Sequence, residues 1–229
     1  MGPVKFPSPK DMWEKHEKIV LEVFSLALEM LRNEEDLPPI EDRISEILSL
    51  KTREANYWLN QNNRGLQYPP NWEKPIPPMT DSDLGYPQKK KRPDFSCTFR
   101  NNSAQNASEA YVEYHIECKC LGEPTSPTWK LNVNYVVKGI YRFLDPTHGY
   151  GKGANSSTMI GYILSMDIQT ILQDINQFIQ GESIYQIPRI RFQNTSNDTS
   201  IAKAKHPFIR EYINPPSFHL WHLWVNLIK

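Results

Sequence analysis

AYVEYHIECKCL, the segment from residue 110 to residue 121, decides the fold. Successive side chains of a strand point to opposite faces, so Glu117 and Lys119 project together while Cys118 points the other way. The face that Cys118 shares consists of Val112, Tyr114, Ile116, Cys118 and Cys120. We therefore expect a strand with one apolar face, and with a carboxylate and an ammonium side by side on the other.

A second strand is expected over residues 94–100, directly after Pro93. If the two strands are neighbours, the Asp94 carboxylate reaches the face that carries Glu117 and Lys119. Two carboxylates can hold Mg²⁺, a hard cation that prefers oxygen ligands, and Mn²⁺ can substitute for it. Such a cation activates a bound water for attack on a phosphodiester, and a lysine beside it can orient that water. Asp94, Glu117 and Lys119 are therefore the candidate catalytic residues.

The flanking segments predict an α/β protein, a sheet with helices on its faces. Hydrophobic periodicity predicts helices over residues 11–33, 40–59, 126–144 and 167–179, and further strands over 159–165, 187–192 and 218–227. The second of these helices is expected to bury a face made of Ile40, Ile44, Ile47, Leu48, Ala55 and Trp58. The proline-rich residues 68–93 are expected to form a connecting loop. We find no strong boundary, so residues 1–229 are interpreted as one domain.

Pro93-Asp94, followed by Glu117-Cys118-Lys119 and then by a helix, a strand and a helix, resembles the PD-(D/E)xK nuclease superfamily. The resemblance implies a restriction-endonuclease-like core, a mixed sheet flanked by helices, over about residues 40–180. An N-terminal helix precedes that core, and a strand extension over residues 181–229 follows it. In this family the aspartate and the glutamate bind the divalent metal, and the lysine supports the attacking water.

The family often completes its metal site with a glutamate from the preceding helix, and Glu41 matches that position. The alternative is that Glu41 is a first-turn acid favoured by the helix dipole, and Asp42 competes for the same role. The resemblance further implies a Mg²⁺-dependent endonuclease acting on DNA in restriction or anti-phage defence, as a homodimer or with a partner subunit. Two alternatives remain: a catalytically idle nucleic-acid-binding or interaction subunit, and an RNA phosphodiesterase.

Four basic residues are candidate nucleic-acid contacts. Lys91 and Arg92 close a basic run beside Asp94, whereas Lys138 and Arg142 are four residues apart on the expected helix over 126–144. The family often places DNA-facing groups on that helix; the alternative for all four is an ordinary solvated surface. The chain has 26 basic and 26 acidic residues, so a basic footprint must be local.

Cysteine and histidine content bears on metal binding and on the compartment. Three cysteines, Cys97, Cys118 and Cys120, are typical of a reducing compartment, and we interpret them as buried structural thiols rather than zinc ligands. His206, His219 and His222 are interpreted as core or edge histidines. The sequence has neither a secretory signal nor an apolar run that would span a bilayer, so we expect a cytoplasmic protein without a membrane partner.

Overall fold

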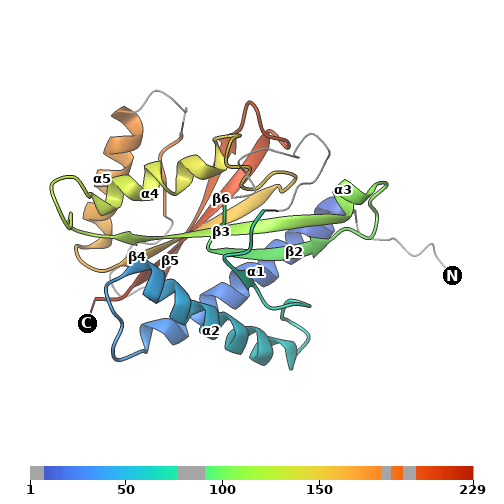
Figure 1. Ribbon diagram of the computed structural model, residues 1–229, viewed down its shortest axis with the longest axis horizontal. Coiled ribbons are helices and arrows are strands. Elements are labelled where there is room, and N and C mark those ends of the chain that lie inside the picture. The colour runs from blue at the N-terminus through green and yellow to red at the C-terminus, as the bar shows by residue number, and fades with distance from the viewer. Residues whose placement is uncertain (1–7, 77–90, 182–186, 193–199, 229) are drawn as a thin grey trace.

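The computed structural model describes residues 8–76, 91–181, 187–192 and 200–228 (Figure 1). Its helices are α1 (Pro9–Arg32), α2 (Glu41–Asn60), α3 (Ala107–Ala110), α4 (Leu131–Val137), the 3₁₀ helix η3 (Ile140–Phe143) and α5 (Ile168–Gly181). Its strands are β1 (Asn71–Trp72), β2 (Phe95–Arg100), β3 (Tyr111–Leu121), β4 (Ser156–Ile163), β5 (Ile201–Ile209) and β6 (Ser217–Asn226). The expected α/β class is confirmed.

The strands form one mixed sheet in the order β1-β2-β3-β4-β6-β5. The pairs β1/β2, β2/β3 and β5/β6 are antiparallel, whereas β3/β4 and β4/β6 are parallel. The two C-terminal strands therefore continue the same sheet beyond β4. The segment over residues 110–121 is β3, and its expected neighbour over residues 94–100 is β2.

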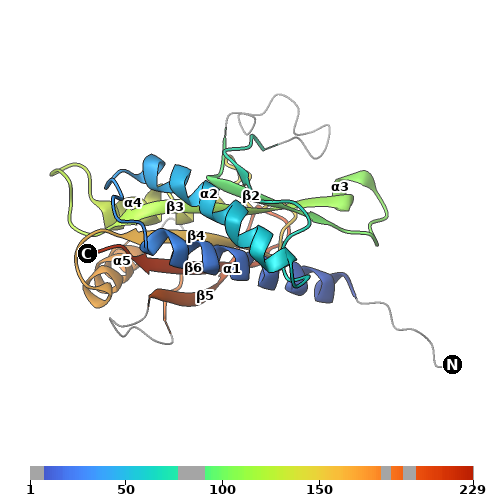
Figure 2. The same cartoon turned by 90° about the horizontal axis from the view of Figure 1, so that it is seen from below.

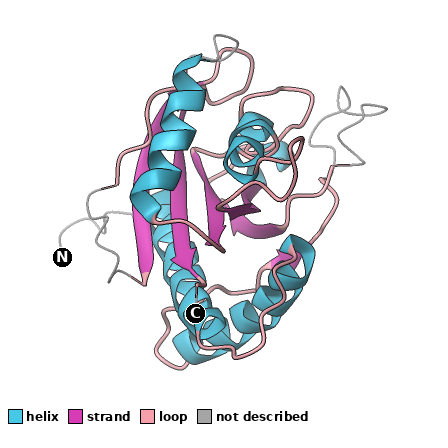
Figure 3. Ribbon diagram, turned by 90° about the vertical axis from the view of Figure 1, so that its left-hand side faces the viewer, coloured by secondary structure: helices cyan, strands magenta, loops and turns pink. Residues whose placement is uncertain are grey.

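Helices cover both faces of this sheet, as Figures 1 and 2 show. On one face α1 and α2 bury an apolar core that includes Phe24, Leu48 and the Cys118 side of β3. On the other face α4 and α5 bury a second core that includes Tyr135, Ile175 and Trp224. Figure 3 shows the sheet between the two helical layers. This two-sided burial explains why β3 and β4 have almost no exposed positions.

Local sequence signals account for how α1 begins and is attached. Ser8 caps the helix by accepting a hydrogen bond from the Asp11 amide, and the Asp11 carboxylate accepts one from the Ser8 amide. Trp13 then donates from Nε1 to Ser156 Oγ on β4 at 2.9 Å. Because Phe24 and its apolar neighbours follow at helical spacing, the whole length of α1 packs onto the sheet.

The structure corrects the expected helix over residues 126–144. The α-helix covers only 131–137, and η3 follows after Gly139, whose backbone lies outside the helical region at φ −116° and ψ −83°. A Cβ at Gly139 would collide with the Tyr135 carbonyl oxygen and the Met159 side chain. Lys138 and Arg142 therefore do not share one helical face.

Three smaller expectations also change. Residues 187–192 have no regular structure, and the missed strand is β5. The connecting loop over residues 68–93 contains the short strand β1, while its residues 77–90 lie outside the described residues. Trp58, expected in the core, is 54% exposed and stacks edge-on with Tyr57. Among the described helices, none is both long and apolar enough to cross a lipid bilayer.

Candidate active site

The site forms where β2 and β3 separate. Their pairing runs from Arg100 opposite Tyr111 to Phe95 opposite Ile116, so β3 continues beyond residue 116 without β2. On its other side this stretch pairs with β4, whereas two amides on the side that β2 has left find side-chain acceptors. Cys118 N donates to Asp94 Oδ2 at 2.6 Å, and Cys120 N donates to Glu41 Oε2 at 2.9 Å. Two carboxylates from distant parts of the sequence therefore close the fork between the strands.

Lys119 joins the acids of the fork. Its Nζ lies 2.9 Å from Glu117 Oε1 and 2.7 Å from Glu41 Oε1. It also donates to the Cys118 carbonyl oxygen at 2.6 Å, so three acceptors fix the ammonium. The expected convergence of Asp94, Glu117 and Lys119 is present in the structure, and Glu41 joins them from the first turn of α2.

Arg142 is the second cation of the site. It reaches from η3 to Glu117 Oε1, the same oxygen that Lys119 contacts. Glu117 is completely buried, and its Oε2 has no hydrogen-bond partner in the described part of the chain. One oxygen of Glu117 is thus doubly paired and the other is an unsatisfied buried acceptor, which is costly without a further partner.

The electrostatics follow from burial and crowding. Burial and then the negative charge of Glu117 raise the pKa of Asp94 well above its ordinary value. Burial would lower the pKa of Lys119, but the charges of Glu117, Asp94 and Glu41 together raise it above the ordinary lysine value. The ammonium therefore stays protonated throughout the neutral range, whereas the pair Asp94 and Glu117 attracts a positive ligand.

These residues fit a hard divalent cation in donor chemistry. Asp94, Glu117 and Glu41 offer carboxylate oxygens, and the unsatisfied Glu117 Oε2 is a natural ligand atom. In the described ranges, however, no three acidic, histidine or cysteine side chains are already arranged as a metal-ligand group. Arg142 and Lys119 instead neutralise Glu117, so cation binding requires the carboxylates to rearrange.

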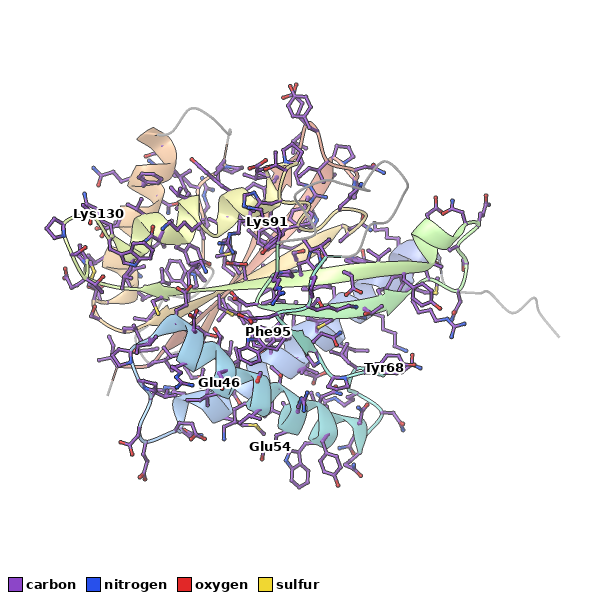
Figure 4. All side chains as sticks on the ribbon, viewed as in Figure 1. Glu46, Glu54, Tyr68, Lys91, Phe95 and Lys130 are labelled. Carbon is purple, nitrogen blue, oxygen red and sulfur yellow. The ribbon has the colours of Figure 1, made fainter. Side chains whose placement is uncertain are left out.

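The four basic residues expected at a nucleic acid lie in different places. Figure 4 shows Lys91 on the α4 side of β3, where its charge acts on His148, and Arg92 is exposed beside it. Lys138 lies over the Trp129 ring, 3.7 Å from its centroid. Of the four, only Arg142 contacts a residue of the site, and the structure gives Lys138 a different partner.

Sequence reasoning missed the residues that contact the glycine-rich loop over residues 149–153. Tyr150 is buried against His115, and the Gly151 amide donates to His115 Nδ1 at 3.0 Å. Arg210, only 2% exposed, donates to the carbonyls of Gly151, Ala154 and Pro215. The glycine spacing was the available signal, because Gly149, Gly151 and Gly153 all have positive φ.

His148 and Asp145 form a second pair missed from the sequence. His148 Nδ1 lies 3.1 Å from Asp145 Oδ2, and the imidazole meets the Tyr150 ring edge-on. Burial lowers the pKa of His148, and the positive charges of Lys91 and Arg142 act in the same direction. This pair therefore lies at the margin of the site, on the side of Lys91.

Comparison of the chain with protein-family models, with curated proteins and with solved structures gave no match.

Proposed function

We propose that this protein is a Mg²⁺-dependent endonuclease of the PD-(D/E)xK type, which hydrolyses phosphodiester bonds in DNA. The observation that carries the proposal is the meeting of Asp94, Glu117, Lys119 and Glu41 where β2 and β3 separate. Three acids and one ammonium from three separate segments of the chain are brought together, and one of the acids, Glu117, is completely buried. An ordinary surface ion pair does not require that burial.

Each residue has a role in the proposed reaction. Asp94 and Glu117, with Glu41, would hold the cation, which supplies Lewis-acid polarisation of the phosphate and activation of water. Lys119 orients the attacking water and donates to the negative charge that develops on the phosphate. Because the surrounding acids raise the pKa of Lys119, it acts as a charged donor and not as the proton acceptor. Glu41 positions the ammonium from its far side.

The arrangement of the sheet supports a restriction-endonuclease-like core. Glu117 and Lys119 lie on β3, Asp94 directly precedes its antiparallel neighbour β2, and the sheet continues in parallel through β4. Helices flank both faces, with Glu41 at the beginning of α2. This combination agrees with the resemblance of the Asp94 to Lys119 segment, and it is the structural basis of the family proposal.

The biological setting is proposed from the resemblance alone. A restriction or anti-phage effector would act in the cytoplasm, on DNA, as a homodimer or with a partner subunit. Lys91 and Arg92 support a nucleic-acid substrate because they directly precede Pro93 and Asp94. A DNA duplex has two strands, so two copies of a one-site chain would be needed for a concerted double-strand cut.

A second candidate is a catalytically idle subunit that binds nucleic acid or another protein. It is supported by the double pairing of Glu117, since Lys119 and Arg142 already neutralise the carboxylate. An ion pair of this kind can be purely structural, because separating its partners would leave a buried charge uncompensated. The two candidates differ in whether a cation can replace part of this pairing.

The deciding experiment is a cleavage assay on purified protein with supercoiled plasmid and, separately, with RNA, in Mg²⁺ or Mn²⁺. Lys119→Ala is compared with Lys18→Ala, an exposed lysine on α1 at the opposite face of the sheet. Cleavage of DNA by the wild type and Lys18→Ala, but not by Lys119→Ala, supports the endonuclease. Cleavage of RNA alone identifies an RNA phosphodiesterase. No cleavage of either substrate with either metal favours the idle subunit.

A further inference from the structure

Arg142 and a divalent cation would need the same carboxylate. Arg142 contacts Glu117 Oε1, and the cation of the proposed function would also bind Glu117. We propose that Arg142 competes with the divalent cation for Glu117 and, once displaced, binds the phosphate of the substrate. This inference rests on the proposed function, and it adds a residue that couples metal binding to substrate binding.

The two cations on Glu117 are held very differently. Lys119 extends from β3 itself, and Glu41 and the Cys118 carbonyl hold it in place. Arg142 comes from the short helix η3, and its side chain is 29% exposed. Replacing Arg142 therefore breaks one ion pair at the margin of the site, whereas replacing Lys119 removes contacts to Glu41, Glu117 and the Cys118 carbonyl oxygen. Arg142 is the partner that can leave.

The charges of the site favour that exchange. When all three carboxylates are ionised to hold a cation, Asp94, Glu117 and Glu41 carry three negative charges, and Lys119 and Arg142 carry two positive charges. A divalent ion added to both basic side chains would make the site positive. The same ion beside Lys119 alone balances the three acids. Because like charges repel strongly in a buried setting, entry of the ion favours departure of Arg142.

The displaced guanidinium can stay close to the site, beside Tyr150. Its carbon lies 5.9 Å from the centre of the Tyr150 ring, against which it can remain packed. His148 meets the same ring, and Lys91 is close enough to lower the pKa of His148. Arg142 would thus join a margin that already carries positive charge. A guanidinium can bind two phosphate oxygens at once, which makes it suited to the backbone of a nucleic acid.

Calorimetric titration of Mn²⁺ into the protein without substrate tests the competition. The wild type is compared with Arg142→Gln and with Arg53→Gln, which removes the same charge from an exposed position of α2. Arg142→Gln is expected to bind Mn²⁺ roughly tenfold more tightly, and Arg53→Gln to match the wild type. Equal or weaker binding by Arg142→Gln would overturn the competition.

Binding to a short DNA duplex tests the second half of the proposal. Ca²⁺ replaces Mn²⁺, and a gel verifies that the duplex stays intact. The wild type is expected to bind the duplex more tightly when Ca²⁺ is added, and Arg142→Gln to lose most of that gain. The same gain in both proteins would contradict a phosphate role for Arg142.

The failure of this inference can be told apart from the failure of the proposed function. If Asp94→Asn weakens Mn²⁺ binding while Arg142→Gln leaves it unchanged, the competition is wrong and the metal site stands. If neither the wild type nor Arg142→Gln binds Mn²⁺, both proposals are overturned. Should Arg142→Gln not fold, the side-chain Nε resonance of Arg142 in the wild type must shift on addition of Ca²⁺; an unchanged resonance overturns the inference.

Discussion

Glu41 holds the candidate active site together from outside the sheet. It accepts from Lys119 Nζ through one oxygen and from the Cys120 amide through the other. A neutral amide at this position could still accept one of these bonds, but it would lose the charge that attracts the ammonium. A Glu41→Gln variant can therefore distinguish a role in holding Lys119 from a role in which Glu41 only interacts with the helix dipole.

We expect Glu41→Gln to lower the initial rate of plasmid nicking in Mg²⁺ by about 10- to 100-fold, as is usual for residues that support a metal site. Asp42→Asn is the matched control, because Asp42 is the next residue of the same helix turn and is exposed. The control should retain the wild-type rate. Equal rates for the two variants would show that Glu41 only favours the beginning of α2.

Two histidines in the core form a chain of hydrogen bonds with a fixed direction. Tyr135 donates to His222 Nδ1 at 2.7 Å, His222 Nε2 donates to His206 Nδ1 at 3.1 Å, and His206 Nε2 donates to the Pro188 carbonyl at 2.6 Å. The carbonyl can only accept, which sets both neutral tautomers. The expectation of core histidines is confirmed for His206 and His222.

Burial lowers the pKa of His206 to about 4 and that of His222 well below its ordinary value. The unfolded chain therefore binds more protons below pH 6.5, and stability falls as the pH drops from 6.5 toward 4. His206→Gln should make the free energy of unfolding less dependent on pH in this window, by about 1.4 kcal/mol per pH unit. Urea denaturation between pH 7 and pH 5 measures how the free energy of unfolding depends on pH in the wild type and in His206→Gln. The same pH dependence in both proteins would contradict a neutral His206.

At the level of single residues, strand alternation was sufficient to place Glu117 and Lys119 on one face. Asp94 joined them because β2 is the neighbour of β3, as expected. Arg142 could not be assigned to Glu117 from the sequence, since its position depends on the turn at Gly139 and not on a helical repeat. The partner of a long side chain is decided by tertiary packing, which periodicity does not record.

Gly139 determines the turn between α4 and η3. It therefore determines the backbone position from which the Arg142 side chain extends. A Cβ at this position would collide with a backbone carbonyl, which cannot swing aside as a side chain can. The glycine also follows directly after the end of α4, and the buried residues Ile140 and Phe143 of η3 come next. An element boundary thus controls the geometry of a site residue three positions later.

Gly139→Ala should destabilise the protein by about 1–3 kcal/mol, the range for an overpacked interior. Gly181→Ala is the control, because an added Cβ there meets nothing within 4 Å and lies at the end of α5. That variant should be neutral or slightly stabilising, since alanine favours a helix. The free energy of unfolding in urea compares them, and an unchanged value for Gly139→Ala would refute the steric argument.

Strands and helices with a regular pattern of apolar residues were predicted from the sequence. Elements whose residue pattern depends on their position in the sheet were not. The helices α1, α2 and α5 and the strand β3 have regular apolar patterns. The strand β5 was missed because it is an edge strand, with Lys203, Lys205 and Pro207 on an exposed face. A proline is tolerated at such an edge, although it argues against a strand in the sequence alone.

For the whole molecule, the formal net charge of zero predicts weak general attraction to nucleic acid. Any affinity must come from a few local contacts, such as Lys91 and Arg92. The logarithm of the DNA affinity should therefore decrease only shallowly with the logarithm of the salt concentration. Each phosphate contact that is lost should flatten that slope by about 0.9.

Fluorescence anisotropy with a labelled duplex at several salt concentrations tests this expectation. Lys91→Gln and Arg92→Gln should each weaken binding and flatten the slope, whereas Lys18→Gln on the far face of the sheet should leave both unchanged. The same loss in all three variants would indicate that total charge, and not a local footprint, determines binding.

The fork between β2 and β3 also provides a spectroscopic reporter of the ligand state. The amides of Cys118 and Cys120 depend for their acceptors on two carboxylates that a cation would attract. Solvent hydrogen exchange at these two positions therefore follows what happens to Asp94 and Glu41, without any substrate or turnover. Arrival of a ligand would be visible as a change in two backbone signals near the C-terminal end of an otherwise buried strand.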